Sequence, residues 1–322
     1  MHKLFPNLEK KFNKINNSII VVGGGRWALI ILQELLLNFK QLKEIIIVTN
    51  NNEILKNFSN KQKKKIKLKK NFDFLKKKNK HKFAIIANSN KDHFSTSKLL
   101  IQNSLNLLVE KPLVENISQY KYLLKLSKAK KCKIFVSMPF YFSYYFYYFK
   151  KKYLKNRKYK IYFEWHDEIN EIRDGILKKH DFSINYVQDT IYHFYGILAC
   201  LYGKKKIIYI DSINKKNSGY LKVKYFKNII FLNCSRKKKN KRVREIIFKS
   251  NLKKYFINYS NDNEIRIIYN GKRKKLNLNF CQKTLKFQLY YFLNFRKVKE
   301  KFLLNDINKI NDLIKLKFNM NN

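Results

Sequence analysis

Residues 19–29 read IIVVGGGRWAL and decide the fold of the N-terminal part of the chain. The first four are apolar and β-branched, as in a buried strand, and a helical pattern begins at Trp27. Between them, Gly23, Gly25 and Ala28 supply the G-x-G-x-x-A pattern of a dinucleotide-binding turn. The first glycine permits a tight turn, the second lets a pyrophosphate approach the backbone, and the small alanine lets the helix pack on the sheet.

This turn predicts a binding site for a nicotinamide dinucleotide. The chain has only eight glycines, so three in a row between a strand and a helix favour a binding turn over a loop without a function. The N–H groups at the start of the helix would point at the phosphates of the cofactor. We therefore expect cofactor contacts from four residues of this turn: Gly23, Gly25, Arg26 and Trp27.

The end of the second predicted strand, residues 44–48, bears on the choice of cofactor. An NAD-binding domain usually presents Asp or Glu there to the adenosine ribose, whereas this chain has Thr49 and Asn50 followed by two more asparagines. Without a carboxylate there is no repulsion of a ribose 2′-phosphate, and nearby lysines would attract one. The sequence favours NADP, and NAD stays open because Asn can also bind a ribose hydroxyl.

The order of the elements predicts an α/β protein. Apolar strands alternate with helices up to residue 137, which indicates a parallel sheet covered on both faces. Long strand candidates follow at residues 159–165, 206–213, 223–234, 244–249, 255–259 and 265–269, with helices at 187–201, 285–299 and 306–317. The second half therefore predicts an α/β domain with an open, largely antiparallel sheet.

Three parts follow from this pattern. Residues 1–17 are a polar, lysine-rich extension, residues 18–137 form the Rossmann domain, and residues 138–322 form a domain for substrate binding and oligomerisation. The last helix is a candidate to pack back on the Rossmann domain.

Two further motifs resemble a known family. The third strand of the Rossmann domain ends in Ala87-Asn88-Ser89-Asn90, with His93 close behind, and the fourth ends in Val109-Glu110-Lys111-Pro112-Leu113. In this order and spacing they resemble the Gfo/Idh/MocA oxidoreductases, the relatives of glucose–fructose oxidoreductase and inositol dehydrogenase. The motifs that carry the resemblance span about residues 18–205.

The resemblance implies roles for these residues. Asn88, Ser89 and Asn90, with His93, would line the nicotinamide ribose, and Glu110 with Lys111 would close the cofactor site. Lys111 would also reach the reacting oxygen of the substrate, where a cation stabilises alkoxide character and can pass a proton. Pro112 would fix the turn that presents the lysine, and its peptide bond is a candidate for the cis form.

The third family feature is an Asp and a His four residues apart on a helix. Asp189 and His193 have that spacing, which places both side chains on one helix face. By the resemblance, His193 would be the general acid/base, with Asp189 and Lys111 as its supporting partners. Alternatively, His193 lies on an amphipathic helix beside a chance acidic neighbour.

The chain departs from the family pattern around this helix. Asn185-Tyr186-Val187-Gln188 stands where relatives often carry glycines, and Gly196 stands where many carry an acidic residue. These departures put a simple sugar or polyol substrate in question. Further candidates for the substrate pocket, for which surface positions are an alternative, are Arg173, Tyr192, His166 and His180.

The formal net charge of +49 has a compositional explanation. Nine of the 71 basic residues are Arg, and the abundant residues Lys, Asn, Ile, Phe and Tyr have A/T-rich codons. An AT-rich genome accounts for this pattern, and functional nucleic-acid surfaces tend to favour Arg. We expect salt-sensitive adhesion to polyanions but no specific nucleic-acid partner.

The cysteines and the apolar segments indicate a reduced, cytoplasmic protein. Cys132, Cys200, Cys234 and Cys281 lack the paired spacing of a metal site or a disulfide framework, so no metal is expected. The uncharged stretch 134–149 is shorter than the ~20 residues of a membrane span and predicts a strand that runs into an aromatic helix.

These observations predict an NAD(P)-dependent oxidoreductase that moves a hydride to or from a C–O or C–N centre. The family default is a sugar, cyclitol or aminosugar substrate, in a homo-oligomer. One alternative is an NADPH-dependent reductase of an imine or ketone intermediate in a specialised biosynthetic pathway. Another is a dinucleotide-binding module without turnover.

Overall fold

The computed structural model describes residues 18–76, 81–154, 158–170, 172–173, 176–177, 186–237, 242–251, 254–260, 264–269, 272–277, 284–299 and 303–319. The chain divides into two compact units: Met1–Met138 with Leu285–Ile310, and Pro139–Thr284 with Asn311–Asn322. Residues 285–310 thus cluster with the first unit, although their position in the sequence predicts that they belong to the second domain. The predicted extension, residues 1–17, lies outside the described residues.

The first unit contains a six-stranded sheet, and the prediction of a parallel sheet is confirmed. Its strand order is β3-β2-β1-β4-β5-β6. Strands β1, β2, β4, β5 and β6 are buried along their whole length, which explains their nearly continuous apolar sequences. The strands are β1 (Ile19–Val22), β2 (Ile45–Val48), β3 (Ile66–Lys69), β4 (Phe83–Ile86), β5 (Asn106–Val109) and β6 (Ile134–Val136).

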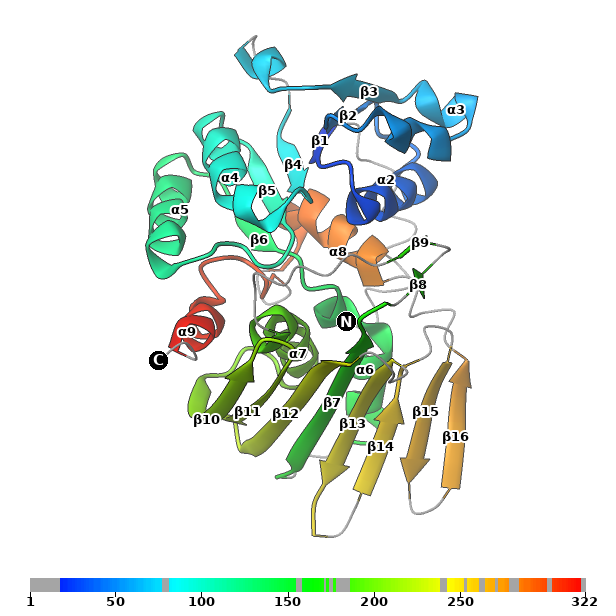
Figure 1. Ribbon diagram of the computed structural model, residues 1–322, viewed down its shortest axis with the longest axis vertical. Helices are drawn as coiled ribbons and strands as arrows, with labels where there is room; N and C mark the ends of the chain where they lie inside the picture. The colour runs from blue at the N-terminus through cyan, green and yellow to red at the C-terminus, as the bar shows by residue number, and fades with distance from the viewer. Residues whose placement is uncertain are drawn as a thin grey trace. The chain divides into compact units, whose positions relative to one another are not determined.

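Helices cover both faces of this sheet (Figure 1). Helices α4 and α5 pack together on one face, and α2 and α8 lie on the other. Phe292 of α8 packs edge-on against Phe83 and Phe135 of the sheet, at centroid distances of 5.4 and 5.8 Å. The helical segments of this unit are α2 (Arg26–Asn38), η2 (Asn52–Asn57), α3 (Asn60–Lys63), η3 (Asp73–Lys76), η4 (Asn90–Asp92), α4 (His93–Gln102), α5 (Ile117–Ala129), α8 (Thr284–Leu293) and η7 (Phe295–Lys297).

The strand order places the predicted cofactor residues at one edge of the sheet. The chain moves outward from β1 to β2 and β3 on one side, and then returns to β4 on the other. The carboxyl ends of β1 and β4 therefore form a topological switch point, where open α/β sheets bind their ligands. The loops after β1, β2, β4 and β5 all leave from this edge.

The second unit contains an eight-stranded mixed sheet in the order β10-β11-β12-β7-β13-β14-β15-β16. Only the β12–β7 pair is parallel, so the prediction of a largely antiparallel sheet is confirmed. The strands are β7 (Lys160–Glu168), β10 (Ile207–Lys215), β11 (Ser218–Tyr225), β12 (Asn228–Lys237), β13 (Val243–Lys249), β14 (Lys254–Asn258), β15 (Glu264–Tyr269) and β16 (Lys272–Asn277), and a separate hairpin joins β8 (Ile172–Arg173) and β9 (Ile176–Leu177).

The long helix α7 (Tyr186–Tyr202) packs on one face of this sheet (Figure 1). The approach is close: a Cβ at Gly219 of β11 would lie 2.1 Å from Cγ2 of Val187. The other helical segments of this unit are η5 (Pro139–Phe142), α6 (Tyr144–Lys152) and α9 (Asn311–Asn319). Strand β6 leads through η5 into the aromatic α6, as expected from stretch 134–149. No helix in the described ranges is long and apolar enough to cross a membrane.

The structure differs from the predicted elements in three places. The single strand expected at 223–234 is a hairpin of β11 and β12, whose turn contains Phe226 with φ +56°, without the glycine or proline that marks most turns. Strand β16 was missed because its sequence, KRKKLN, lacks an apolar alternation. The last helix begins at Asn311 rather than 306, because Asp306 forms a β-bridge with Phe135.

Candidate functional site

The glycine turn after β1 is sterically fixed. Gly23 has φ +127°, a conformation that side chains rarely adopt, and a Cβ there would lie 2.4 Å from the carbonyl oxygen of Ala87. A Cβ at Gly24 would lie 2.2 Å from Oγ1 of Thr49. The loops after β2 and β4 thus close against the glycines, and neither position accepts a side chain without a shift of backbone or neighbour.

Gly25 has the opposite surroundings. No atom lies within 4 Å of the position that its Cβ would occupy, and the residue is exposed. It is the N-cap of α2 and provides no side-chain cap for the helix. The first N–H groups of α2 lack intrahelical partners and have no side-chain cap, and the space beside Gly25 is open. This geometry fits a pyrophosphate at the helix N-terminus.

The loop after β2 carries no carboxylate next to the strand. Asn50 is exposed, and Thr49 accepts a hydrogen bond at Oγ1 from the backbone N–H of Asn51 at 3.0 Å. The Asn51 side chain donates to the carbonyl of Gly24 at 2.7 Å, which ties this loop to the glycine turn. The first acidic residue after β2 in the sequence is Glu53, and it forms an exposed ion pair with Lys56.

His93, which follows the β4 loop, is completely buried. Its Nδ1 lies 2.7 Å from the carbonyl oxygen of Pro112, so the protonated Nδ1 donates to that carbonyl. Burial lowers the pKa of the imidazole, which keeps it neutral. Within the described residues, its Nε2 has no hydrogen-bond partner. The histidine links the two loops that carry the Asn88–Asn90 and Glu110–Lys111 motifs.

The polar loop itself is held from one side. Asn88 donates from Nδ2 to Oγ1 of Thr96 on α4 at 3.0 Å, and its buried Oδ1 has no partner among the described residues. Ser89 is exposed, whereas Asn90 is partly exposed and begins η4. The Asn88 side-chain carbonyl oxygen is therefore an acceptor at the carboxyl edge that the protein has not satisfied, as a site for ribose hydroxyls requires.

Glu110 and Lys111 follow β5 at the same edge. Burial raises the pKa of the Glu110 carboxyl, although the residue keeps part of its surface exposed, and the Ser137 hydroxyl and the Trp27 indole lie beside it. Lys111 is partly exposed, and the Lys111–Pro112 bond is cis, as anticipated. Arg26 and Trp27 form the first turn of α2, next to the glycines.

In the second unit, Asp189 and His193 lie on α7, and both are partly exposed. Oδ2 of Asp189 accepts a hydrogen bond from Nη2 of Arg236 on β12 at 3.2 Å. The Arg236 guanidinium also lies 4.5 Å from the ring centroid of Tyr186, the first residue of α7. The structure thus gives Asp189 a buried cationic partner from the sheet.

The His193 imidazole is surrounded by aromatic rings. It stacks on Trp165 of β7 with a centroid distance of 5.1 Å and an interplanar angle of 12°. Phe140 meets it edge-on at 5.5 Å and 90°. Tyr259 packs against both Trp165 and Phe140, and its buried hydroxyl has no hydrogen-bond partner within the described part of the chain.

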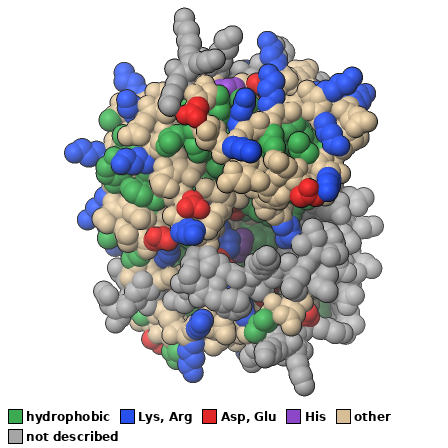
Figure 2. Space-filling view, turned by 45° about the horizontal axis from the view of Figure 1, so that its top comes forward, with side chains coloured by type: hydrophobic (Ala, Val, Ile, Leu, Met, Phe, Trp, Pro, Cys, Tyr) green, Lys and Arg blue, Asp and Glu red, His purple; other side chains and the backbone are tan. Residues whose placement is uncertain are grey.

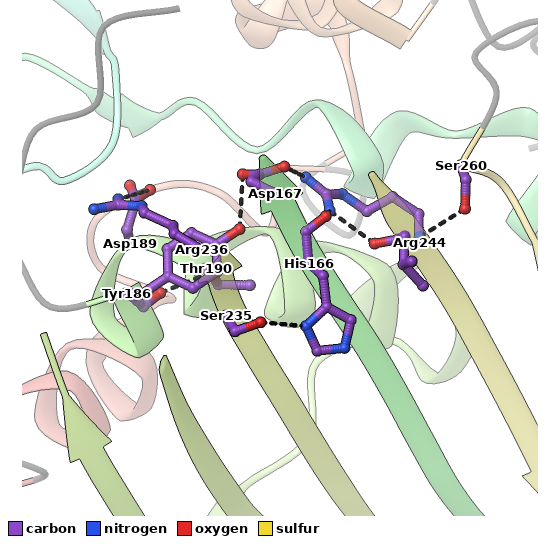
Figure 3. Close-up of polar contacts among 10 residues, drawn as sticks. His166, Asp167, Tyr186, Asp189, Thr190, Ser235, Arg236, Arg244 and Ser260 are labelled. Atoms are coloured by element: carbon purple, nitrogen blue, oxygen red, sulfur yellow. Dashed lines mark hydrogen bonds and ion pairs between the residues drawn. The ribbon is translucent and has the colours of Figure 1, made fainter. Parts of the chain in front are cut away.

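A second ion pair, which is buried on both sides, lies beside these residues. Asp167 of β7 pairs with Arg244 of β13, and both side chains are at most 6% exposed. Oδ2 of Asp167 also accepts a hydrogen bond from the Tyr186 hydroxyl at 2.7 Å (Figure 3). Such a pair is costly to bury and is retained only with good geometry and satisfied hydrogen bonds.

Sequence reasoning identified Asp189 but missed the other three residues of these pairs, Arg236, Asp167 and Arg244. A signal was present in the strand alternation. Asp167 has the phase of the buried Ile161, Phe163 and Trp165. Arg236 and Arg244 likewise occupy the phase of the buried apolar residues on β12 and β13. A charged residue in the buried phase of a strand needs a buried partner and could have been singled out on that ground.

The remaining pocket candidates divide into three groups. His166 points away from Asp167, and its Nδ1 lies 2.7 Å from the Ser235 hydroxyl (Figure 3). Its Nε2 lies 2.9 Å from Oε2 of Glu164. Tyr192 is completely buried on α7. The side chain of Arg173 and all of His180 lie outside the described residues, as does Cys281. In the described residues, no group of three or more His, Cys, Asp or Glu side chains could hold a metal ion.

The comparisons with known proteins agree with this geometry. Residues 18–138 match the model of the GFO_IDH_MocA oxidoreductase family, described by its NAD-binding Rossmann fold. The N-terminal domain is therefore similar to the NAD-binding domain of the Gfo/Idh/MocA oxidoreductases. This match supports an NAD(P)-dependent oxidoreductase. No curated protein sequence matches the chain.

Solved structures of several dehydrogenases and reductases share the fold of most of the chain. A dehydrogenase (MviM) from Clostridium difficile is 17% identical with a TM-score of 0.72, and the match covers 95% of this chain and 99% of that one. UDP-N-acetylglucosamine 3-dehydrogenase from Acidithiobacillus ferrooxidans is 14% identical with a TM-score of 0.69, covering 94% and 95%. A 3-ketoreductase from Actinomadura kijaniata, solved as a mutant in complex with NADP, is 9% identical with a TM-score of 0.69, covering 94% and 96%.

Proposed function

We propose that this protein transfers a hydride between a nicotinamide cofactor and a C–O or C–N centre of a small polar metabolite. The observation that carries the proposal is the open N-terminus of α2 over Gly25, with the Asn88 side-chain carbonyl oxygen unsatisfied at the same edge of the sheet. One feature fits a pyrophosphate and the other a ribose. Bound there, the cofactor would supply or accept the hydride.

Lys111 and His193 are the proposed catalytic residues. Lys111 leaves the carboxyl end of β5, the edge that carries the glycine turn, and its ammonium group would stabilise negative charge on the reacting oxygen. His193 would give a proton to that oxygen during reduction, or remove one during oxidation. Asp189, held by Arg236, would support the imidazole as a negative charge on the same helix.

NADP is the proposed cofactor, because the loop after β2 presents Thr49 and Asn50 rather than a carboxylate. The amide side chain adds no charge that would repel a ribose 2′-phosphate, whereas Asp or Glu would. Fluorescence titration with NADPH and NADH measures the preference. Tighter binding of NADH would refute the assignment.

A sugar, cyclitol or aminosugar derivative is the proposed substrate. Two of the structural neighbours are named for related chemistry, one as a 3-dehydrogenase of UDP-N-acetylglucosamine and one as a 3-ketoreductase. The sequence around Asp189 differs from the family pattern, and an imine or ketone of a specialised pathway is the second candidate. A panel of sugar nucleotides, keto-sugars, simple ketones and cyclic imines separates the two classes.

The deciding experiment is NADPH oxidation with this panel by the wild type and by two variants, Lys111→Ala and His193→Ala. We expect both substitutions to lower turnover by about 10²-fold or more while NADPH binding persists, since acid–base catalysis contributes about 10²–10⁴-fold. A wild type that binds NADPH and oxidises none of it with any member of the panel would instead be a binding module without turnover. Unchanged turnover in both variants would overturn the assigned roles.

A homo-oligomer is proposed through the outer face of the eight-stranded sheet. Tyr162 and Phe231 stack there at 4.8 Å and 7°, on the side opposite the buried residues of β7. Ile213 of β10 is 55% exposed. Two copies of such a face would bury apolar area at low cost. Light scattering of the purified protein measures the mass, and a monomer at micromolar concentration would refute the proposal.

Specific nucleic-acid binding is not proposed. Lys and Arg side chains are spread over the described part of the face in view rather than gathered into one patch (Figure 2). Such a surface attracts polyanions through counterion release alone, and that attraction falls steeply with salt. Binding of DNA or RNA that survived about 0.2 M salt with a sequence preference would contradict this view.

A further inference from the structure

The position of the His193 ring is set by the sheet as well as by its own helix. The imidazole lies nearly parallel to the Trp165 indole, with a centroid distance of 5.1 Å and an angle of 12°. Phe140 stands perpendicular to the imidazole at 5.5 Å, and also perpendicular to the indole, at 5.8 Å and 87°. Two rings that pack against each other, Trp165 and Phe140, therefore flank the imidazole of the proposed catalytic pair.

Stacking constrains the direction of proton transfer. Both nitrogens of an imidazole exchange protons in the plane of the ring, so the ring plane determines where a proton can be given or taken. A parallel indole covers a ring face and leaves the edges accessible. The perpendicular Phe140 hinders rotation of the imidazole out of that plane, because the rotated ring would meet the phenyl edge.

Trp165 is itself clamped by Arg244. The guanidinium carbon lies 3.9 Å from the indole ring centroid, within the range of a strong cation–π contact. The guanidinium is fixed in turn, because Nη1 donates to the carbonyl oxygens of His166 and Val243 at 2.7 and 2.8 Å. It also pairs with the buried Asp167.

The same network reaches the start of α7. Asp167 accepts a hydrogen bond from the hydroxyl of Tyr186, the first residue of the helix that carries His193 (Figure 3). Burial, with the neighbouring Asp167 charge, raises the pKa of Tyr186 well above its usual value, so the phenol remains a donor. One buried pair, Asp167 with Arg244, thus holds both the helix start and the indole against which the imidazole lies.

We propose that Trp165 is a positioning residue for His193, and that Arg244 holds Trp165 in place for this task. The proposal deepens the function proposed above, since it gives a role in proton transfer to a residue that touches neither substrate nor cofactor. The expected effect on turnover rests on the proposed catalytic role of His193. The positioning of the imidazole by Trp165 and Arg244 does not depend on that role.

The geometry is tested by NMR on protein with ¹³C-labelled histidine. The chain has six histidines, and a His193→Gln sample assigns the resonance of interest. We expect the ring protons of His193 to be shifted upfield by the indole. The shift is lost in Trp165→Leu and reduced in Trp165→Phe, which keeps a smaller ring. Phe248→Leu is the matched control: it removes a buried ring from β13 that packs on Phe149 and Tyr159, and it should leave the resonance in place.

An unchanged His193 resonance in Trp165→Phe would overturn the proposal, even if Trp165→Leu failed to fold. The kinetic consequence is read on any carbonyl compound that the wild type reduces with NADPH. Trp165→Leu should lower kcat by about 10²-fold with little change in KM, since small misplacements of a catalytic group cost about that much, and Trp165→Phe should recover part of the loss. A kcat equal to that of the wild type would also overturn the proposal. If His193→Gln keeps full turnover while the NMR shifts behave as expected, the catalytic role of His193 fails and the packing stands.

Discussion

Removing one member of the Asp167–Arg244 pair should destabilise the second unit strongly. Both side chains are at most 6% exposed, so Asp167→Asn leaves a guanidinium charge buried without its counter-ion. The loss from breaking a buried pair is about 3–5 kcal/mol, a large share of the ~5–15 kcal/mol that stabilises a typical protein. For a unit of this size that corresponds to a fall of about 6–20 °C in Tm.

A double-mutant cycle separates this effect from a general loss of packing. Arg244→Met leaves the carboxylate unpaired, whereas the double variant Asp167→Asn/Arg244→Met removes both charges. We expect the double variant to lose about 1–3 kcal/mol less than the sum of the two single variants. Simple additivity would refute the argument that the buried charges depend on each other. Glu53→Gln, which breaks the exposed pair with Lys56, is the control and should cost less than about 1 kcal/mol.

The two tryptophans allow the assay to follow each unit. Trp27 lies in the first unit and Trp165 in the second, and the chain has no others. In a Trp27→Phe background, urea unfolding followed by fluorescence reports on the second unit. In the protein that keeps Trp27, retention of NADPH binding reports on the folding of the first unit. The midpoint of the Trp165 signal should fall in the single variants, with NADPH binding retained in dilute urea.

Four further outcomes follow from the geometry. Gly24→Val should abolish NADPH binding in titrations while leaving the second unit folded, because its Cβ would lie 2.2 Å from Oγ1 of Thr49. Asn50→Asp should weaken NADPH binding roughly tenfold relative to NADH, which corresponds to ~1.4 kcal/mol of repulsion. Burial raises the pKa values of Cys200 and Cys234 to about 12, so both thiols should resist alkylation at pH 8 until urea is added. In the unfolded chain these thiols lose their protons at a lower pH than in the folded chain. The free energy of unfolding should therefore fall as the pH rises above about 8.5. Phe231→Lys should convert the expected oligomer to monomers in light scattering, and an unchanged mass would show that this face is not the interface.

Much of the first unit could be predicted from the sequence because its signals are local. A buried parallel strand is an unbroken apolar run, and the conformation of Gly23 is one that only glycine adopts easily. Residues 19–29 therefore predict both the strand and the turn. The edge at which the predicted cofactor residues gather follows from the parallel order of the strands. The cofactor roles of these residues remain proposals.

The second unit was less predictable because its contacts join distant strands. The partner of Asp189 is Arg236, 47 residues away, and that of Asp167 is Arg244, 77 residues away. The four-residue spacing of Asp189 and His193 is a local signal within one helix. The contact of Asp189 with Arg236 depends on a strand distant in sequence, which no local pattern reveals. The hairpin at Phe226 was hidden for another reason, since this turn residue is also a good strand residue.

The return of residues 285–310 to the first unit has a consequence for biosynthesis. When Val136 emerges from the ribosome, all six strands of the Rossmann sheet exist, yet Phe83 and Phe135 still lack the Phe292 side chain that packs against them. At translation rates of about 5–20 residues per second, this face waits roughly 8–30 s for its cover. This apolar face of the nascent first unit is therefore uncovered while residues 139–284 of the second unit are synthesised. We expect a chaperone to matter most for this chain during that interval.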